Sequence, residues 1–242
     1  MAFDKNSNGF TFGFSVVLVI VVGTVLAVTY MSLKPAYNEN VRREKMQNIL
    51  ASMRIEVDRD AAPAEYEKLV GSNTKLIDAQ GNEVEGNAFD LDVLKQYKSW
   101  KAGEIKAEDM KYPVYMATKD GQQLYVLPVV GTGLWGPIWG YLSVQEDGRT
   151  VYGSTFDHKG ETPGLGAEIS TPIFEDQFPG KTIADENGKY TSIKVYKGGT
   201  GTTDPHGVDG ISGGTITSEG VDEMLKRTLA VYDTYLNSNI AK

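Results

Sequence analysis

The chain opens on a long, continuous run of apolar residues. No charged residue occurs between Lys5 and Lys34, and positions 10–30 are almost entirely apolar. About 20 helical residues, at about 1.5 Å each, cross a hydrocarbon layer of about 30 Å. The pattern therefore predicts a transmembrane helix over about residues 11–31. A cleaved signal peptide is the main alternative, but its apolar region usually has about 7–15 residues.

The charges around this span bear on its orientation and role. Lys5 is the only cation before it, whereas Lys34, Arg42, Arg43 and Lys45 follow it. The positive-inside rule taken alone would place the following domain in the cytoplasm. The span itself has no ionisable side chain. Because such groups usually mark ion pathways, we do not expect this chain to conduct ions by itself.

Beyond the span, the pattern changes from apolar to alternating. A helical stripe is expected from Pro35 to about Asp58. Strand patterns follow at residues 75–78, 112–117 and 124–130, and the last two flank Asp120-Gly121, which is typical of a hairpin. Further strands are expected at residues 150–153 and 190–196.

The C-terminal region reads as an amphipathic helix. From Ser218 to Leu236, apolar residues recur at spacings of four, four, three and four. Strands enclosed by terminal helices predict an α+β fold. We expect an N-terminal tail and transmembrane helix over residues 1–34, and one mixed α+β domain over residues 35–242.

Composition excludes several classes of site. The 242-residue chain has no cysteine, so disulfides, thiolate metal sites and cysteine nucleophiles are ruled out. Two histidines are too few for a histidine metal cluster, and we expect no metal site. The net charge is −8, with no basic stripe, so nucleic acid is not an expected partner.

The most informative motif is Ser212-Gly213-Gly214-Thr215, just before the last helix. Two glycines let a bulky group approach the backbone closely, because neither has a Cβ. A helix start offers unpaired N–H groups and the positive end of a dipole, which favour a phosphate. A threonine there could carry a phosphate-bearing cofactor as an ester. The alternative is an ordinary loop and helix cap.

A second loop, residues 161–168, suits a flat ligand. Pro163, Gly164 and Gly166 permit a tight backbone around one exposed apolar side chain, Leu165. A surface turn that starts a helix is the alternative. Trp135, between glycines, could stack on a flat ring or pack in the core.

Two possible hydrolytic pairs match no hydrolase motif. His158 with Glu161 has no third orienting group, and Ser212 with His206 lacks a nucleophile elbow. We interpret the His158–Glu161 pair as structural, do not expect a serine hydrolase, and expect no catalytic residue on this chain.

Taken together, these motifs resemble the C subunit of the Na+-translocating NADH:quinone oxidoreductase, a family that carries covalent FMN. The resemblance runs almost end to end, and the order and spacing of its pieces are highly specific. They are one N-terminal span followed by Leu33-Lys34-Pro35, then Leu127-Pro128, Gly131-Thr132-Gly133-Leu134-Trp135, Trp139-Gly140-Tyr141, His158-Lys159-Gly160-Glu161-Thr162-Pro163-Gly164-Leu165-Gly166, Lys197-Gly198-Gly199, His206-Gly207-Val208-Asp209-Gly210 and Ser212-Gly213-Gly214-Thr215.

The resemblance assigns roles to particular residues. It implies that Thr215 is esterified to the FMN phosphate. Thr217 ranks below Thr215, because it lacks the preceding run of small residues. This sequence departs from the family in having Gly214 where alanine is usual before the threonine. The resemblance also implies that Glu161, Thr162, Leu165 and Gly166 line the flavin, with Trp135 as a weaker candidate, beside Ser212, Gly213 and Gly214 of the attachment motif.

Lys197 is a further candidate cofactor-binding residue. A lysine near a flavin would stabilise its anionic reduced form, and a solvated surface lysine is the alternative.

The same resemblance implies a function and a location. The chain would relay electrons between other subunits of a Na+-pumping, NADH:ubiquinone-reducing complex, without a complete active site of its own. Its partners would be the other membrane subunits and a flavin transferase. The domain would lie on the outer side of the bacterial inner membrane, against the charge count; we follow the resemblance, because flanking charge is only a statistical bias.

Two alternatives stay open on sequence alone. One is the G subunit of an Rnf-type ferredoxin:NAD+ complex, which shares the attachment motif. The other is a membrane-tethered flavin-binding sensor. The Leu33-Lys34-Pro35 run, the long insert at about residues 60–125 and the segment at residues 135–141 favour the Na+ pump.

Overall fold

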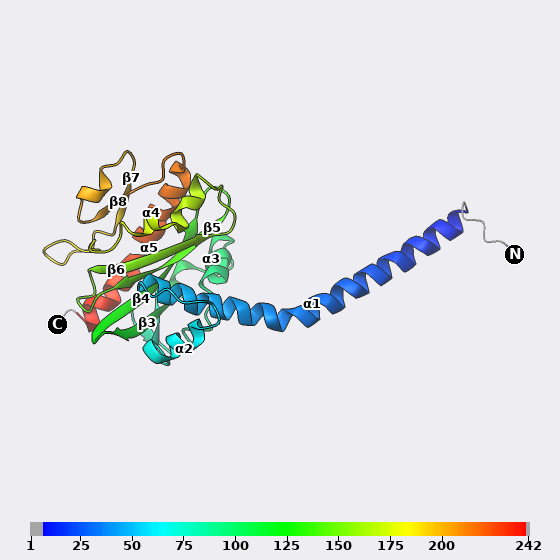
Figure 1. The fold of residues 1–242 in the computed structure, drawn as a ribbon, viewed down its shortest axis with the longest axis horizontal. Helices are drawn as coiled ribbons and strands as arrows, with labels where there is room; N and C mark the ends of the chain where they lie inside the picture. Colours follow the sequence, from blue (N-terminus) through cyan, green and yellow to red (C-terminus); the bar gives the residue numbers. More distant parts are fainter. Residues whose placement is uncertain (1–6, 241–242) are drawn as a thin grey trace. The chain divides into compact units, whose positions relative to one another are not determined.

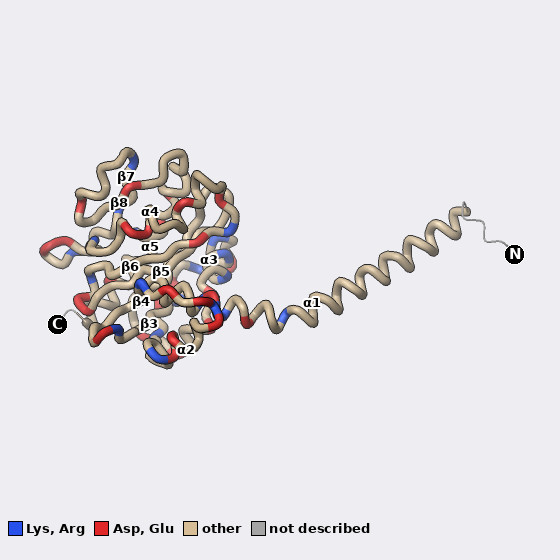
Figure 2. The backbone as a smooth tube through the Cα atoms, viewed as in Figure 1, with Lys and Arg blue, Asp and Glu red and all other residues tan. Residues whose placement is uncertain are grey.

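The computed structural model describes residues 7–240 and begins with one long helix, α1, Asn8–Ser52. By length and composition this helix is able to cross a membrane, and Figure 2 shows its N-terminal stretch free of charged residues. It continues through Pro35, which has no N–H to donate to the preceding turn. It ends six residues before the expected Asp58. The chain forms two compact units, which divide between Lys45 and Met46.

The second unit is built on a six-stranded antiparallel sheet in the order β2-β1-β3-β4-β5-β6 (Figure 1). The predicted hairpin is confirmed: its turn residues Asp120 and Gly121 have φ angles of 51° and 82°, as a type I′ turn requires. The strands are β1 Thr74–Asp78, β2 Glu83–Val84, β3 Lys111–Lys119, β4 Gln122–Thr132, β5 Pro137–Val144 and β6 Val151–His158.

Helices and a small second sheet complete the unit. The strand expected at residues 190–196 is confirmed only over its last three residues, because Ser192 has a φ of 65° and interrupts the extended backbone. The elements are α2 Ala62–Leu69, α3 Val93–Lys101, η1 Ala107–Asp109, η2 Gly166–Ser170, α4 Pro172–Glu175, η3 Gly201–Thr203, α5 Thr215–Asn239 and the parallel pair β7 Lys194–Tyr196 and β8 Gly207–Asp209.

Both faces of the large sheet are buried, because apolar residues occupy successive positions along its central strands. Leu127 packs in the core cluster that holds α5, and Val126 packs in the cluster on the other face. That second cluster contains Ile49 and Leu50 from the end of α1 and Met53 just after it, together with residues of α2. The predicted α+β class is therefore confirmed, with α5 lying across the sheet against β4 (Figure 1).

The packing of α5 fixes one end of β4. A Cβ on Gly220 of α5 would collide with the carbonyl oxygen of Thr132, so only glycine permits this approach. The Tyr97 hydroxyl of α3 lies 3.0 Å from the Thr132 hydroxyl. The turn after β4 and the start of α5 are thereby held close together, and the candidate site lies there.

Candidate functional site

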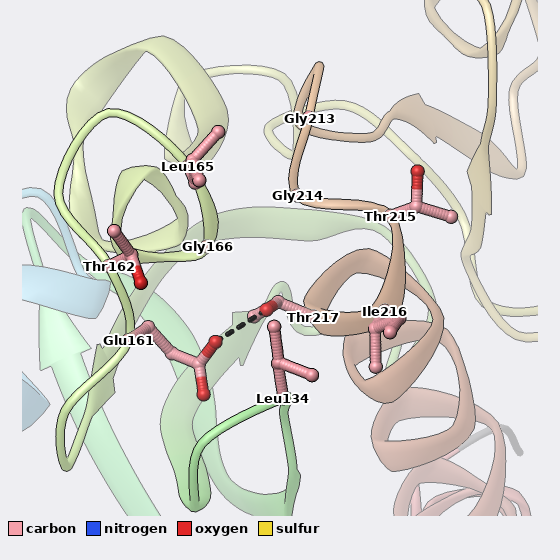
Figure 3. Close-up of a pocket in the computed structure, with 10 residues that line it drawn as sticks. All are labelled: Leu134, Glu161, Thr162, Leu165, Gly166, Gly213, Gly214, Thr215, Ile216 and Thr217. Atoms are coloured by element: carbon pink, nitrogen blue, oxygen red, sulfur yellow. Dashed lines mark hydrogen bonds between the residues drawn. The ribbon is translucent and has the colours of Figure 1, made fainter.

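A cavity of about 190 Å³ lies where three segments meet (Figure 3). These segments are the turn after β4, the loop after β6 and the first turn of α5. The lining residues are Leu134, Glu161, Thr162, Leu165, Gly166, Gly213, Gly214, Thr215, Ile216 and Thr217. Seven of the ten cofactor-binding residues predicted from the sequence are among them. Ser212, Trp135 and Lys197 are not.

Glu161 joins the three segments. Its side chain is buried, with 4% of the residue exposed. One carboxylate oxygen accepts a hydrogen bond from the backbone N–H of Trp135 at 2.8 Å, and the other accepts from the Thr217 hydroxyl at 2.6 Å. The Glu161 N–H in turn donates to Nδ1 of His158 at 3.1 Å. The Glu161 carboxylate therefore holds the cavity walls together, and His158 contacts the backbone of Glu161 within the same loop.

Glycines let these walls approach one another. A Cβ on Gly166 would collide with the Thr217 hydroxyl and lie 2.6 Å from a Glu161 carboxylate oxygen. Gly213 has a φ of +76°, and a Cβ there would lie 2.7 Å from a Leu165 methyl. Both positions require glycine.

Gly214 is under less constraint than Gly213. Its φ is −103°, and a Cβ there would lie 3.1 Å from Ile211 and 3.2 Å from the nitrogen of Gly166. An alanine would fit after a shift of a few tenths of an ångström. The departure from alanine at this position therefore leaves the loop geometry intact.

The start of α5 presents unpaired donors to the cavity. The helix begins at Thr215, three residues before the predicted Ser218, with Gly214 as a cap that offers no side chain. Within residues 7–240, nothing accepts a hydrogen bond from the backbone N–H groups of Thr215, Ile216 and Thr217. Such groups, at the positive end of a helix dipole, favour an anion such as a phosphate.

Two threonines stand at this helix start in different environments. Thr215 is exposed, whereas Thr217 is 1% exposed and its hydroxyl is bound to Glu161. Figure 3 shows the Thr217 hydroxyl directed at that carboxylate, with the Thr215 side chain on another side of the turn. Of these two, only Thr215 has a hydroxyl available to a reagent from solution.

Three predicted residues lie near the cavity without lining it. Trp135 is 68% exposed, and only its backbone contacts Glu161. Lys197 forms an exposed ion pair with Glu219, with 2.6 Å between Nζ and the carboxylate. Ser212 is exposed on the loop before Gly213.

Leu134, Ile216 and Thr217 line the cavity but were not predicted as site residues. Leu134 and Ile216 are each about half exposed, at 49% and 53%, which is unusual for large apolar side chains in this domain. Each is a direct neighbour of a predicted residue, Trp135 or Thr215. An apolar residue directly next to a predicted cofactor-binding residue is the signal that identifies Leu134 and Ile216.

These features fit a ligand that combines a phosphate with a flat apolar ring. Free N–H groups suit the phosphate, and Leu134, Leu165 and Ile216 offer apolar contacts. Pockets that enclose a small ligand usually measure about 300–1,000 Å³, so a cavity of about 190 Å³ holds only part of such a molecule. The remainder of the ligand stays at the surface.

Comparison with known proteins agrees with this interpretation. Residues 133–230 match the model of the FMN-binding domain, and this range contains every residue that lines the cavity. The chain is 36% identical over 230 residues to the C subunit of the Na(+)-translocating NADH-quinone reductase of Vibrio vulnificus, covering 90% of this chain and 87% of that one. The chain belongs to this family of C subunits.

Other C subunits extend the comparison. The Yersinia pestis protein is 32% identical over 239 residues, covering 91% of this chain and 90% of its own. The crystal structure of the C subunit from Parabacteroides distasonis has a TM-score of 0.76 and 43% identity, over 86% of this chain and 98% of that one. The Shewanella oneidensis NqrC structure has a TM-score of 0.66 and 26% identity, over 82% and 99%. The family expected from the motifs is confirmed, with an FMN-binding domain.

Proposed function

We propose that this chain carries FMN covalently on Thr215 and relays electrons within a Na+-translocating NADH-quinone reductase, of which the C subunit is one part. The observation that carries the proposal is the exposed Thr215 hydroxyl at the start of α5, beside three unpaired backbone N–H groups. A phosphoester there keeps one negative charge, which these donors and the helix dipole stabilise.

The difference in burial favours Thr215 over Thr217 as the site of flavin attachment. The Thr217 hydroxyl already donates to Glu161 and is covered by Gly166. Esterifying Thr217 would break that bond and leave a buried carboxylate with one donor fewer, which costs about 1–3 kcal/mol. Among residues 7–240, the Thr215 hydroxyl has no hydrogen-bond partner that esterification would displace.

Formation of the ester needs an activated donor. A flavin dinucleotide supplies it: the bond between Thr215 Oγ1 and phosphorus forms, and the phosphoanhydride bond of the dinucleotide breaks. The hydroxyl proton passes to a base of a flavin transferase, and the nucleoside monophosphate leaves. The chain itself contributes an accessible hydroxyl at the first residue of α5.

Relay requires a cofactor edge that a partner can reach. The flavin supplies one- and two-electron chemistry when bound, and the protein binds and orients it. Leu134, Leu165 and Ile216 form a partly exposed rim on a small cavity, which supports a cofactor only partly enclosed. Electrons can then enter and leave through other subunits of the same complex.

We place the chain in the bacterial inner membrane through α1. The apolar stretch of α1 supports membrane association, and the resemblance to the family supports an outer-side domain against the count of flanking charges. Protease treatment of intact spheroplasts tests the orientation. Digestion of the domain is expected, and resistance would put the domain in the cytoplasm.

The covalent link is tested by mass spectrometry of the full chain, made together with a flavin transferase. Tryptic peptide 198–226 contains both threonines, and fragmentation locates the adduct. We expect it on Thr215 alone. Thr215→Ala should abolish the adduct and leave the melting temperature nearly unchanged, because the side chain is exposed.

Thr217→Val is the matched control, since it removes the other hydroxyl and keeps the volume of the side chain. It should keep the adduct on Thr215. A bare Thr215 in the assembled complex, or a Thr215→Ala variant that keeps covalent flavin, would overturn the proposal.

A further inference from the structure

A side chain outside the Ser212–Thr215 motif and outside the loop at residues 161–168 fixes the segment that leads to Thr215. Gln177 lies two residues after α4 and is half-buried. Its side-chain carbonyl accepts from the backbone N–H of Asp209 at 2.7 Å, and its amide donates to the carbonyl of Asp209 at 3.3 Å. The same amide also lies 3.2 Å from the carbonyl of Ile173.

These contacts satisfy backbone groups at the end of β8 that pair with no strand among the described residues. Asp209 ends β8, whose only partner among the described residues is the three-residue β7. A two-stranded pair is marginally stable by itself. By satisfying both backbone groups of Asp209, Gln177 supplies the hydrogen bonds that a third strand would otherwise make.

From Asp209 onward the backbone is fixed step by step. The N–H of Gly210 donates to the carbonyl of Tyr196 at 2.8 Å, and that of Ile211 donates to the hydroxyl of Ser218 at 2.9 Å. The N–H of Gly214 then donates to the carbonyl of Ile211 at 3.0 Å. Thr215 is therefore presented at the end of a short loop whose first fixed residue is held by Gln177.

We infer that Gln177 is a positioning residue for the modification of Thr215. The inference rests on the proposed function, in which Thr215 Oγ1 attacks the phosphoanhydride of a flavin dinucleotide and displaces a nucleoside monophosphate. Without Gln177, both backbone groups of Asp209 lose a protein partner. The loop then samples more conformations, and fewer of them present Thr215 to the transferase.

The test is the initial rate of flavin attachment to the full chain, with purified transferase and flavin adenine dinucleotide. Gln177→Met keeps the length of the side chain and removes its hydrogen bonds to Asp209 and to Ile173. The two bonds to Asp209, at ordinary strength, correspond to about a thirtyfold loss of rate. Gln177→Glu keeps the acceptor for the Asp209 N–H and should lie between wild type and Gln177→Met.

Gln123→Met is the matched control. Gln123 is also half-buried and donates to a backbone carbonyl, that of Ala117, but on the β3–β4 hairpin. This variant should be modified at the wild-type rate. Hydrogen exchange gives a readout independent of attachment: Gln177→Met should speed exchange in residues 207–214 and leave β3–β5 unchanged.

The outcomes separate the two proposals. A wild-type chain that takes up no flavin on Thr215 overturns the proposed function. Equal attachment rates for wild type and Gln177→Met, with wild type modified normally, overturn the positioning role alone. Unchanged exchange at residues 207–214 in Gln177→Met overturns it as well.

Discussion

Backbone groups at the end of α1 have side-chain hydrogen-bond partners, whereas those at the start of α5, beside the cavity, have none among the described residues. At the end of α1, the carbonyl of Ser52 accepts from the Ser143 hydroxyl at 2.5 Å, and the carbonyl of Met53 accepts from Lys119 Nζ at 2.9 Å. The apolar side chains around them are buried. At the start of α5, three N–H groups lack partners among the described residues, and apolar side chains reach solvent.

The contrast separates a helix end whose backbone groups the protein itself satisfies from one that leaves donors free for a ligand. Helix ends leave about four backbone groups without intrahelical partners, which side chains, water or ligands must satisfy. Side chains from β3 and β5 serve this purpose for α1. The cap residue of α5 is Gly214, which offers no side chain to these donors. The two ends should therefore respond differently to the same kind of substitution.

The largest difference is expected from one leucine in each region. Leu50→Ala removes a fully buried side chain beside the end of α1, which costs about 2–5 kcal/mol. At about 2–4 °C per kcal/mol for a domain of this size, the melting temperature should fall by several degrees. Leu134→Ala, on the half-exposed rim, should cost within about 0.5 kcal/mol.

Thermal unfolding of the full chain in detergent, followed by circular dichroism, measures both. Attachment of flavin to Leu50→Ala well below its melting temperature should match wild type. Equal losses of stability for the two leucines would remove the distinction between the regions.

The next loss of stability is expected when the hydrogen bond between Thr217 and Glu161 is removed. Thr217→Val keeps the volume of the side chain and removes the donor to Glu161. The buried carboxylate then has only the Trp135 N–H, at a cost of about 1–3 kcal/mol. Urea unfolding should show this loss, while the flavin stays on Thr215. Stability equal to that of wild type would mean that the Glu161–Thr217 bond contributes nothing.

The two adjacent glycines should differ although the substitution is the same. Gly213→Ala forces a Cβ into a left-handed conformation and against Leu165, which costs roughly 1–2 kcal/mol. Gly214→Ala has a negative φ and contacts near 3.1 Å, so reduced chain entropy offsets most of the crowding. The stability in urea and the attachment rate should fall only for Gly213→Ala, and similar losses at both positions would contradict the geometry.

A further effect is a pH dependence at the sheet edge. Burial raises the pKa of Glu175 from 4.5 to about 7, against the lowering effect of a hydrogen bond from the Phe156 N–H at 2.6 Å. Between these values the folded state binds more protons than the unfolded state, so stability falls as pH rises from about 4.5 to 7. Glu175→Gln should flatten that slope in urea unfolding at several pH values. An unchanged slope would assign the pH dependence to other groups.

Local patterns predicted most elements of the fold. The apolar run, the hairpin at Asp120-Gly121 and the spacing of α5 each reside within a short stretch of chain, and each is confirmed. The missed parts depend on backbone conformation and loop closure, which the spacing of apolar residues does not show. Ser192 breaks the strand expected at residues 190–196, and the start of α5 moves to Thr215 because Gly214 and Ser218 close the preceding loop.

The sequence by itself determined the membrane-spanning stretch, the family motifs and the choice of Thr215 as the candidate for flavin attachment. Tertiary structure decided that Glu161 bonds Thr217, which lies 56 residues away, and that Gln177 holds Asp209 from 32 residues away. Burial and hydrogen-bond partners arise only when distant segments pack together. A motif can therefore name a reactive hydroxyl, but folding decides which hydroxyl is accessible and what holds it in place.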